Sequence, residues 1–279
     1  MKKISRRSFL AAAGLSVAAL ALTACGGSAS SVASSVASSA ASSEAASTSA
    51  AVGELTTVEA GKLTMATNAA FPPYEMTTDA GDFEGIDIET AQAIADKLGL
   101  ELQIDDMDFD AALLSVQQGK ADIVMAGVTV TDERKAVMDF SDSYATGIQS
   151  IIVPEGSDIA SPDDLAGKKI GTQRGTTGYI YCSDDFGDDS VVAYDDGLTA
   201  VQALNNGQVD AVVIDNAPAQ EFIAANPGLK ILDTSYAEED YAIGMAKNSP
   251  LEDAVNSALE ELKADGTLQA IVDKYITAE

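Results

Sequence analysis

Short apolar runs alternate with longer amphipathic stretches from about residue 60 onward. Short apolar runs predict buried strands, and apolar positions spaced by three and four residues predict helices. Alternation of strand and helix predicts an α/β fold whose mostly parallel sheets are covered on both faces. The expected strands are 63–66, 100–104, 123–126, 169–172 and 211–214, and the expected helices are 86–98, 111–118, 198–205 and one that begins at Pro162.

One part of this pattern occurs twice. A helix ends in glycine and is followed by two residues, an aspartate and an apolar strand, first at Gly119 and Asp122 and again at Gly207 and Asp210. Both residues of the second copy lie 88 positions after those of the first. The same residues also occur in ordinary turns between helices and strands. Taken as a repeat, they predict two similarly built lobes.

An arginine stands in an unusual place after the 123–126 strand. Gly127 and Thr129 follow the strand, and the next helix has two acidic residues and then Arg134 in its first turn. The acidic residues suit the positive end of the helix dipole, whereas an arginine does not. Arg134 therefore indicates that an anion is held beside this helix start, where backbone N–H groups are also free.

The repeat gives Arg134 a counterpart. A shift of 88 positions from Gly127, where the first strand ends, leads to Asp215, where the 211–214 strand ends. Ligands of open parallel sheets bind beyond the carboxyl ends of the strands. If the lobes face each other, Arg134 and Asp215 predict a site for a zwitterion, with the carboxylate at Arg134 and the ammonium at Asp215.

Turns after other strands offer further candidates. Thr176 and Thr177 lie in a Gly-Thr-Thr-Gly turn, which could add N–H and hydroxyl donors to a carboxylate. Phe71 and Tyr74 flank two prolines after the first strand, and Phe109 follows an acidic segment. All three aromatic residues are candidates for walls around an aliphatic ligand side chain, and ordinary core packing is the alternative for each.

Residues 1–25 are typical of an export signal. Basic residues precede an Ala/Leu-rich run, and Leu22-Thr23-Ala24-Cys25 resembles the box at which bacterial lipoproteins are cleaved and lipidated on the cysteine. An uncleaved membrane anchor is the alternative, but the apolar run is short for a span. Arg6 and Arg7 also resemble a twin-arginine signal, so the export route stays open. Residues 26–54, mostly Ser and Ala, are expected to form a disordered tether.

Composition excludes several classes of function. The net charge of −28 argues against nucleic acid and anionic lipid as partners. The chain has no histidine, which excludes Ser-His-Asp catalysis and histidine-based metal sites. The acidic stretches 105–108 and 184–189 lack the spacing of a calcium loop and are expected to be solvated loops. No catalytic residue, metal or cofactor is predicted, and Cys182 has no partner once Cys25 is lipidated.

Several motifs, in the same order, resemble the bacterial solute-binding proteins of family 3, which serve ABC importers of polar amino acids. The resemblance covers about 61–279. Its motifs are Ala66-Thr67-Asn68-Ala69-Ala70-Phe71-Pro72-Pro73-Tyr74-Glu75, Gly85-Ile86-Asp87-Ile88-Glu89, Gly127-Val128-Thr129-Val130-Thr131-Asp132-Glu133-Arg134, Phe140-Ser141-Asp142-Ser143-Tyr144, Gly175-Thr176-Thr177-Gly178 and Ala264-Asp265-Gly266-Thr267.

The resemblance implies a type II periplasmic-binding-protein fold, with two α/β lobes joined by two crossing hinge strands. Lobe 1 is expected at 55–147 and 240–279, and lobe 2 at 148–239. In such proteins an arginine matching Arg134 binds the α-carboxylate, assisted by hydroxyls matching Thr176 and Thr177. The ligand-binding residues implied or predicted are Asn68, Phe71, Tyr74, Phe109, Ala126, Gly127, Thr129, Arg134, Gln173, Thr176, Thr177 and Asp215.

The ligand side chain is less well defined. Family members that take cationic amino acids often have an aspartate where this chain has Asn68, although Glu75 or Asp87 could still contribute. Gln173 and Ile214 match positions that line the side-chain end. A neutral polar or cystine-like amino acid is therefore favoured, with a cationic one as the alternative.

The expected protein is a monomeric, lipid-anchored binding protein at the extracytoplasmic face of the cell membrane, and not an enzyme. It would deliver its amino acid to an ABC permease. An exported dehydratase on the same fold and a sensory domain are the rival functions. The dehydratase needs a general acid, for which Glu75 is the candidate.

Overall fold

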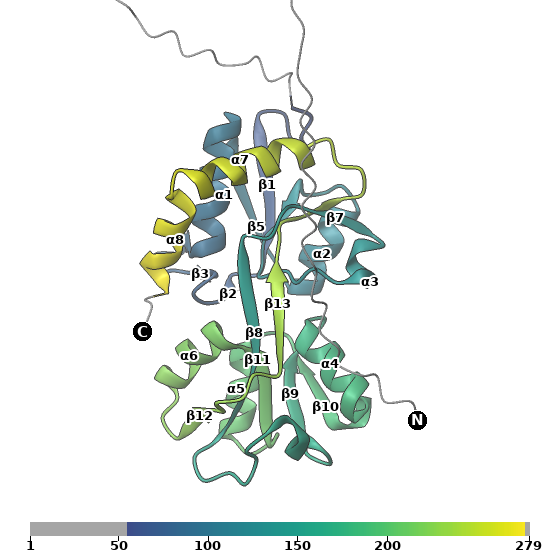
Figure 1. Cartoon of the computed structure of the whole chain (residues 1–279), viewed down its shortest axis with the longest axis vertical. Coiled ribbons are helices and arrows are strands. Elements are labelled where there is room, and N and C mark those ends of the chain that lie inside the picture. Colours follow the sequence, from purple (N-terminus) through teal and green to yellow (C-terminus); the bar gives the residue numbers. More distant parts are fainter. Residues whose placement is uncertain (1–54, 277–279) are drawn as a thin grey trace, which may run out of the picture. The chain divides into compact units, whose positions relative to one another are not determined.

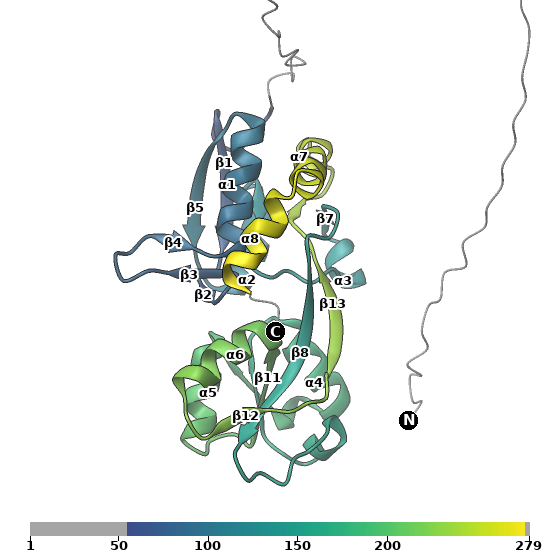
Figure 2. The same ribbon diagram turned by 60° about the vertical axis from the view of Figure 1, so that its left-hand side comes forward.

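The computed structural model describes residues 55–276, which belong to one compact unit of the chain. The expected signal at 1–25 and tether at 26–54 lie outside the described residues. Within the unit, two sheets with helices on both faces form two lobes (Figures 1 and 2). The α/β fold with two lobes predicted from the sequence is confirmed.

Lobe 1 has a five-stranded sheet in the order β5-β1-β6-β14-β7, in which β5, β1 and β6 are parallel. A small sheet, β2-β3-β4, lies beside it. The strands are β1 (Lys62–Thr67), β2 (Ala70–Phe71), β3 (Glu75–Thr77), β4 (Phe83–Glu84), β5 (Glu101–Asp106), β6 (Ile123–Val124), β7 (Met138–Phe140) and β14 (Gly244–Ala246). The helices are α1 (Ile86–Leu98), α2 (Phe109–Gln117), α3 (Asp132–Lys135), α7 (Glu252–Ala264) and α8 (Thr267–Tyr275).

Lobe 2 has a six-stranded sheet in the order β10-β9-β11-β8-β12, with β13 also paired to β8. Strands β10, β9 and β11 are parallel, and the pairs with β8 are antiparallel. The strands are β8 (Ala145–Pro154), β9 (Ile170–Gln173), β10 (Val191–Tyr194), β11 (Ala211–Asp215), β12 (Leu229–Ile231) and β13 (Ala237–Tyr241). The helices are α4 (Thr177–Phe186), α5 (Gly197–Asn205), α6 (Asn216–Ala225) and the 3₁₀ turns η1 (Pro162–Leu165) and η2 (Asp188–Ser190).

Two long strands connect the lobes. β8 and β13 run antiparallel between them, with Ala145 paired to Tyr241 and Gln149 to Ala237 (Figure 1). Beyond Gln149, β8 continues into the lobe 2 sheet through its pairing with β11. The lobe boundaries expected near residues 147 and 239 fall inside these two strands. The chain therefore passes between the lobes along the paired strands β8 and β13.

The repeat seen in the sequence has a structural counterpart. Asp122 Oδ2 accepts a hydrogen bond from the backbone N–H of Thr64 at 2.8 Å, ahead of β6. Asp210 Oδ2 accepts one from the N–H of Lys169 at 2.8 Å, ahead of β11. The glycines three residues before the two aspartates adopt left-handed φ values of 65° and 67°. Each aspartate thus joins its strand to the parallel neighbour, and the expectation of two similarly built lobes is confirmed.

Buried side chains alternate between the two faces of each sheet. In lobe 2, Val212 lies in the same buried cluster as Phe222 of α6, whereas the next residue, Val213, lies in the cluster of Cys182 from α4. Lobe 1 is divided in the same way, with α1, α7 and α8 on one face and α2 on the other. Parallel strands covered on both faces are expected to be apolar at successive positions, as they are here.

Some local predictions were wrong. The acidic stretch 184–189 is not a loop, because α4 runs to Phe186 and η2 begins at Asp188. Tyr181 and Phe186 pack against the buried cluster of lobe 2, so helix packing outweighs the low helix propensity of the aspartates. The helix expected at Pro162 is a single 3₁₀ turn, and the helix that contains Arg134 has only four residues.

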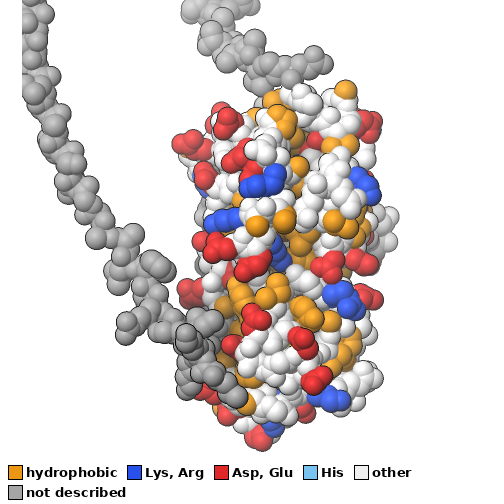
Figure 3. Space-filling view, turned by 90° about the vertical axis from the view of Figure 1, so that its right-hand side faces the viewer, with side chains coloured by type: hydrophobic (Ala, Val, Ile, Leu, Met, Phe, Trp, Pro, Cys, Tyr) orange, Lys and Arg blue, Asp and Glu red, His pale blue; other side chains and the backbone are white. Residues whose placement is uncertain are grey.

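The described surface is strongly acidic. On the face shown in Figure 3, Asp and Glu side chains outnumber Lys and Arg. Among residues 55–276, no helix is both long and apolar enough to cross a membrane.

Candidate functional site

A cavity lies where the strand ends of the two lobes meet. Every predicted site residue except Tyr74 lines it, and Glu75 lines it as well. The lining residues are Asn68, Phe71, Glu75, Phe109, Ala126, Gly127, Thr129, Arg134, Gln173, Thr176, Thr177 and Asp215. Gly127 and Asp215, which the offset of 88 positions relates to each other, both line this cavity.

Arg134 is a buried cation that has no anionic partner within the described residues 55–276. Its side chain enters the cavity from α3, whose start is capped by Thr131 Oγ1 accepting the Arg134 N–H at 3.1 Å. Arg134 Nη1 donates to the carbonyl of Thr129 at 2.8 Å and Nη2 to that of Gly175 at 3.2 Å, and the guanidinium lies 5.3 Å from the centre of the Phe109 ring. Burial lowers the pKa of Arg134. None of the ion pairs within residues 55–276 includes it, so it is placed to receive an anion.

The start of α4 faces Arg134 from lobe 2. Thr176 Oγ1 donates to the carbonyl of Gln173 at 2.8 Å and caps the helix by accepting the N–H of Tyr179 at 3.3 Å. Thr177 Oγ1 donates to Glu239 at 2.9 Å. Each hydroxyl has a single proton, so neither can also donate to a carboxylate in this arrangement. The donors that this turn can offer are the backbone N–H groups at the helix start.

Asp215 is the acidic counterpart, at the end of β11. It is 7% exposed, and its Oδ2 accepts from Gln149 Nε2 at 2.8 Å while Oδ1 accepts from the Tyr241 hydroxyl. Burial raises the pKa of Asp215 to about 7, against the effect of these hydrogen bonds. No cation pairs with it among the described residues. An ammonium group in the cavity would stabilise its ionised form.

Gly127 is held by a second buried acid. Its backbone N–H donates to Asp87 Oδ2 of α1 at 3.0 Å, and its φ of 54° suits glycine. Burial raises the pKa of Asp87 to about 6, and burial beside Asp87 raises that of Glu75 well above its usual value. Because the N–H of Gly127 is used, only its carbonyl is left to contact a ligand, as an acceptor.

Amide groups close the opposite end of the cavity. Gln173 Nε2 of lobe 2 donates to Asn68 Oδ1 of lobe 1 at 2.9 Å, and Asn68 Nδ2 donates to the Met107 carbonyl at 3.0 Å. Phe71 and Phe109 contribute apolar walls. This end is polar without a permanent charge of its own, apart from the nearby carboxyl group of Glu75.

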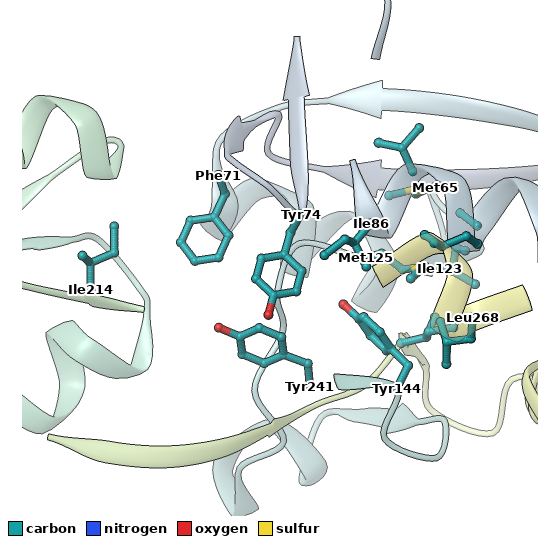
Figure 4. Close-up of a cluster of buried hydrophobic side chains, with 14 of the residues drawn as sticks. Met65, Phe71, Tyr74, Ile86, Ile123, Met125, Tyr144, Ile214, Tyr241 and Leu268 are labelled. Carbon is teal, nitrogen blue, oxygen red and sulfur yellow. The ribbon is translucent and has the colours of Figure 1, made fainter. Parts of the chain in front are cut away.

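Tyr74 of the predicted ligand-binding set does not line the cavity, and neither does Ile214, which was expected near the end of the ligand side chain. The Tyr74 ring stacks on Phe71 with centroids 6.0 Å apart and meets Tyr241 edge-on at 5.3 Å. Figure 4 shows the Tyr74 ring beside those of Phe71 and Tyr241. Core packing, the alternative considered for Tyr74, is therefore its observed environment. Ile214 is also buried outside the cavity, and its side chain lies beside Gly197 of α5.

The sequence did not reveal the groups that the hinge strands contribute. Gln149 of β8 and Glu239 of β13 are buried and form hydrogen bonds with Thr129, Thr177 and Asp215. Glu239 stands in a run of three acids, which resembles an exposed strand. Its alternation with Tyr241, two residues later on the same face, was the signal that it points inward.

Known proteins resemble the chain over most of its length. The L-cystine-binding protein TcyJ of Escherichia coli K12 is 33% identical over 226 residues, covering 79% of this chain and 85% of TcyJ. The arginine-binding extracellular protein ArtP of Bacillus subtilis 168 is 32% identical over 230 residues, covering 78% and 87%.

Solved structures resemble the fold as well. An ancestral arginine-binding protein bound to glutamine has a TM-score of 0.75 and 42% identity, over 79% of this chain and 100% of the other. The arginine-, lysine-, histidine-binding protein ArtJ of Geobacillus stearothermophilus has a TM-score of 0.75 and 34% identity, over 78% and 96%. The family described as bacterial extracellular solute-binding proteins, family 3, matches residues 63–278. The chain therefore belongs to the bacterial extracellular solute-binding proteins of family 3.

Proposed function

We propose that this protein captures an α-amino acid outside the cytoplasm and delivers it to the permease of an ABC importer. One observation carries the proposal: Arg134 and Asp215, buried and of opposite charge, line the same cavity without an ionic partner among the described residues. A zwitterion would satisfy both. The binding proteins for cystine and arginine among its relatives support the same function.

The contacts in the cavity support a role for each end of the ligand. Arg134 and the N–H groups at the start of α4 hold the carboxylate. Asp215, the Thr129 hydroxyl and the Gly127 carbonyl hold the ammonium. The ligand side chain lies between Phe71 and Phe109 and ends near Asn68 and Gln173.

A neutral polar or cystine-like side chain is favoured, because Asn68 and Gln173 present amides and burial favours the neutral form of Glu75. A cationic side chain is the second candidate. Glu75 supports it, since both its carboxyl oxygens are buried without a hydrogen-bond partner among the described residues. The arginine-binding relatives support it as well.

The test of the site is isothermal titration calorimetry against the twenty amino acids and cystine. Arg134→Ala should weaken binding by at least about 30-fold, since breaking a desolvated charge pair costs roughly 2–5 kcal/mol. Arg174→Ala is the matched control, because Arg174 is exposed and pairs only with Asp195 at the surface. Normal binding by Arg134→Ala would rule out this site, and failure of the wild-type chain to bind any of them would rule out the function.

The N-terminal sequence supports anchoring at the membrane by a lipid, including palmitate, on Cys25. The monomeric binding protein would then work at the extracytoplasmic face beside its permease. Cys25→Ser should abolish metabolic labelling with palmitate and release the protein from the membrane fraction. Cys182→Ser, which changes the buried cysteine of α4, should leave the labelling unchanged.

A further inference from the structure

Glu239 is a buried carboxylate just behind the cavity wall. It is 7% exposed and lies on β13, opposite Gly147 of β8. Its Oε2 atom accepts hydrogen bonds from Thr129 Oγ1 at 3.1 Å, Thr177 Oγ1 at 2.9 Å and Gln149 Nε2 at 3.0 Å. None of the ion pairs within residues 55–276 includes it. Hydrogen bonds satisfy its Oε2 atom, whereas its Oε1 atom is buried without a hydrogen-bond partner among the described residues.

These hydrogen bonds determine what the cavity wall can offer a ligand. A threonine hydroxyl has one proton and two lone pairs. Since Thr129 and Thr177 both donate their proton to Glu239, their oxygens can only accept from a ligand, and Thr177 Oγ1 already accepts one hydrogen bond from Gln149 Nε2 at 3.5 Å. The Gln149 amide is committed as well, because its Nε2 donates to both Asp215 and Glu239.

We propose that Glu239 is a specificity-determining residue that makes this end of the site select for an ammonium group. By taking the protons of the two hydroxyls, it leaves acceptors around Asp215, to which an ammonium can donate several protons and a substituent without an N–H or O–H can donate none. The inference deepens the proposed function and rests on it. The acceptor set is also shared between the lobes, because Thr129 comes from lobe 1 and Thr177 comes from lobe 2.

A role in packing alone would not need a carboxylate here. Burying an acid without a cation costs several kcal/mol, and glutamine has nearly the same shape. Glutamine, however, brings an N–H₂ group that can donate to the threonine oxygens and leave their protons free to turn toward the cavity. Glu239→Gln therefore changes the direction of the hydrogen bonds while it keeps the volume.

The experiment compares Glu239→Gln with Glu238→Gln, a control on the exposed face of the same strand. The probes are L-arginine, L-glutamine, L-histidine and L-cystine, each beside the analogue without the α-ammonium: 5-guanidinopentanoate, glutaramate, imidazolepropionate and 3,3′-dithiodipropionate. Calorimetry gives, for each pair, the ratio of the affinity for the amino acid to the affinity for its analogue. Glu239→Gln should lower the ratio for the bound amino acid by about tenfold, the equivalent of one hydrogen bond to a charged group. Glu238→Gln should leave it unchanged.

Equal weakening of amino acid and analogue, or an unchanged ratio, would overturn the inference while leaving the proposed function in place. A wild-type chain that binds none of the four amino acids would overturn both. If Glu239→Gln does not fold, Thr129→Val removes one of the oriented acceptors and should lower the ratio in the same direction. An unchanged ratio in Thr129→Val would then contradict the proposal.

Discussion

At the scale of single residues, the site is dominated by carboxyl groups that are buried and, within residues 55–276, form no ion pair. They are Glu75, Asp87, Asp215 and Glu239, of which Glu75 and Asp215 line the cavity. Burial raises the pKa of Asp215 from its usual 3.8 to about 7, so the folded, ligand-free protein favours the neutral form of this group below about pH 7. Its contribution to folding is therefore largest at low pH and declines as the pH rises from about 4 to about 7.

Binding should show the opposite dependence on pH. A ligand ammonium favours ionised Asp215, so the affinity for an amino acid should rise with pH up to about 8 and fall by up to about 100-fold at pH 5. Asp215→Asn should bind more weakly and show a flatter dependence. Calorimetry at several pH values, in buffers of different ionisation enthalpy, measures both the affinity and the proton release. An affinity that is constant between about pH 5 and pH 8 would contradict this assignment.

The residues that could be predicted from sequence are those that stand out by type and position. Arg134 was identified because a cation at a helix start opposes the helix dipole. Asp215 was identified because it lies 88 positions after Gly127, which is the offset of the sequence repeat. Glu239 could not be separated from its acidic neighbours by composition. Tyr74 was expected at the cavity, but its ring packs against Tyr241 instead. This packing could not be predicted, because Tyr241 lies far away in sequence.

At the scale of elements, the hinge strands both carry the chain between the lobes and position polar groups of the site. Gly147 of β8 lies beneath the Tyr241 ring, and a Cβ at Gly147 would come within 2.5 Å of the ring carbons. Tyr241 is fully buried, and its hydroxyl donates to Asp215. The ring has little room to move, so the requirement for glycine comes from this close approach.

Gly147→Ala should therefore weaken both the fold and the site. Overpacking is expected to reduce the free energy of unfolding by about 1–3 kcal/mol and to lower amino-acid affinity as Tyr241 moves from Asp215. Ile148→Ala is the control, because Ile148 lies on the opposite face of β8 and is 38% exposed. Thermal unfolding followed by circular dichroism gives the stability, and calorimetry gives the affinity. If Gly147→Ala has the stability and the affinity of the wild type, β8 and β13 can shift enough to accommodate the added methyl group, and the prediction is wrong.

Sequence patterns predicted the order of the main elements better than their ends. The strand expected at 123–126 is only Ile123–Val124, because the chain turns at Gly127 to form the site. The apolar run was informative about burial, since Met125 and Ala126 are buried too. Pairing partners decide where a strand ends, and they lie on other segments.

At the scale of the molecule, few side chains join the lobes across the cavity. Gln173 bonds to Asn68, Arg134 bonds to the Gly175 carbonyl, and Glu239 bonds to both lobes. A ligand that pairs with Arg134 and Asp215 would add charged contacts to this small set. Closure of the lobes could be expected from the resemblance to hinged binding proteins, whereas the residues that join the lobes could be identified only from the structure.

The net charge makes a further prediction for the whole protein. The chain has 44 acidic and 16 basic residues, so the folded surface repels itself. Added salt screens this repulsion, with a Debye length of about 10 Å at 0.1 M and about 3 Å at 1 M. It also weakens surface ion pairs such as Lys97–Glu261, but exposed pairs contribute little and most acids have no cation to lose.

Salt should therefore stabilise the ligand-free protein. The melting temperature is expected to rise by several degrees between about 0.02 and 0.5 M NaCl, with each kcal/mol worth about 2–4 °C for a domain of this size. KCl should give the same rise if screening is the cause, whereas binding of one particular cation would separate the two salts. A melting temperature that falls as NaCl is added would mean that the surface ion pairs outweigh the net repulsion. In that case the excess of acidic residues would not destabilise the folded state.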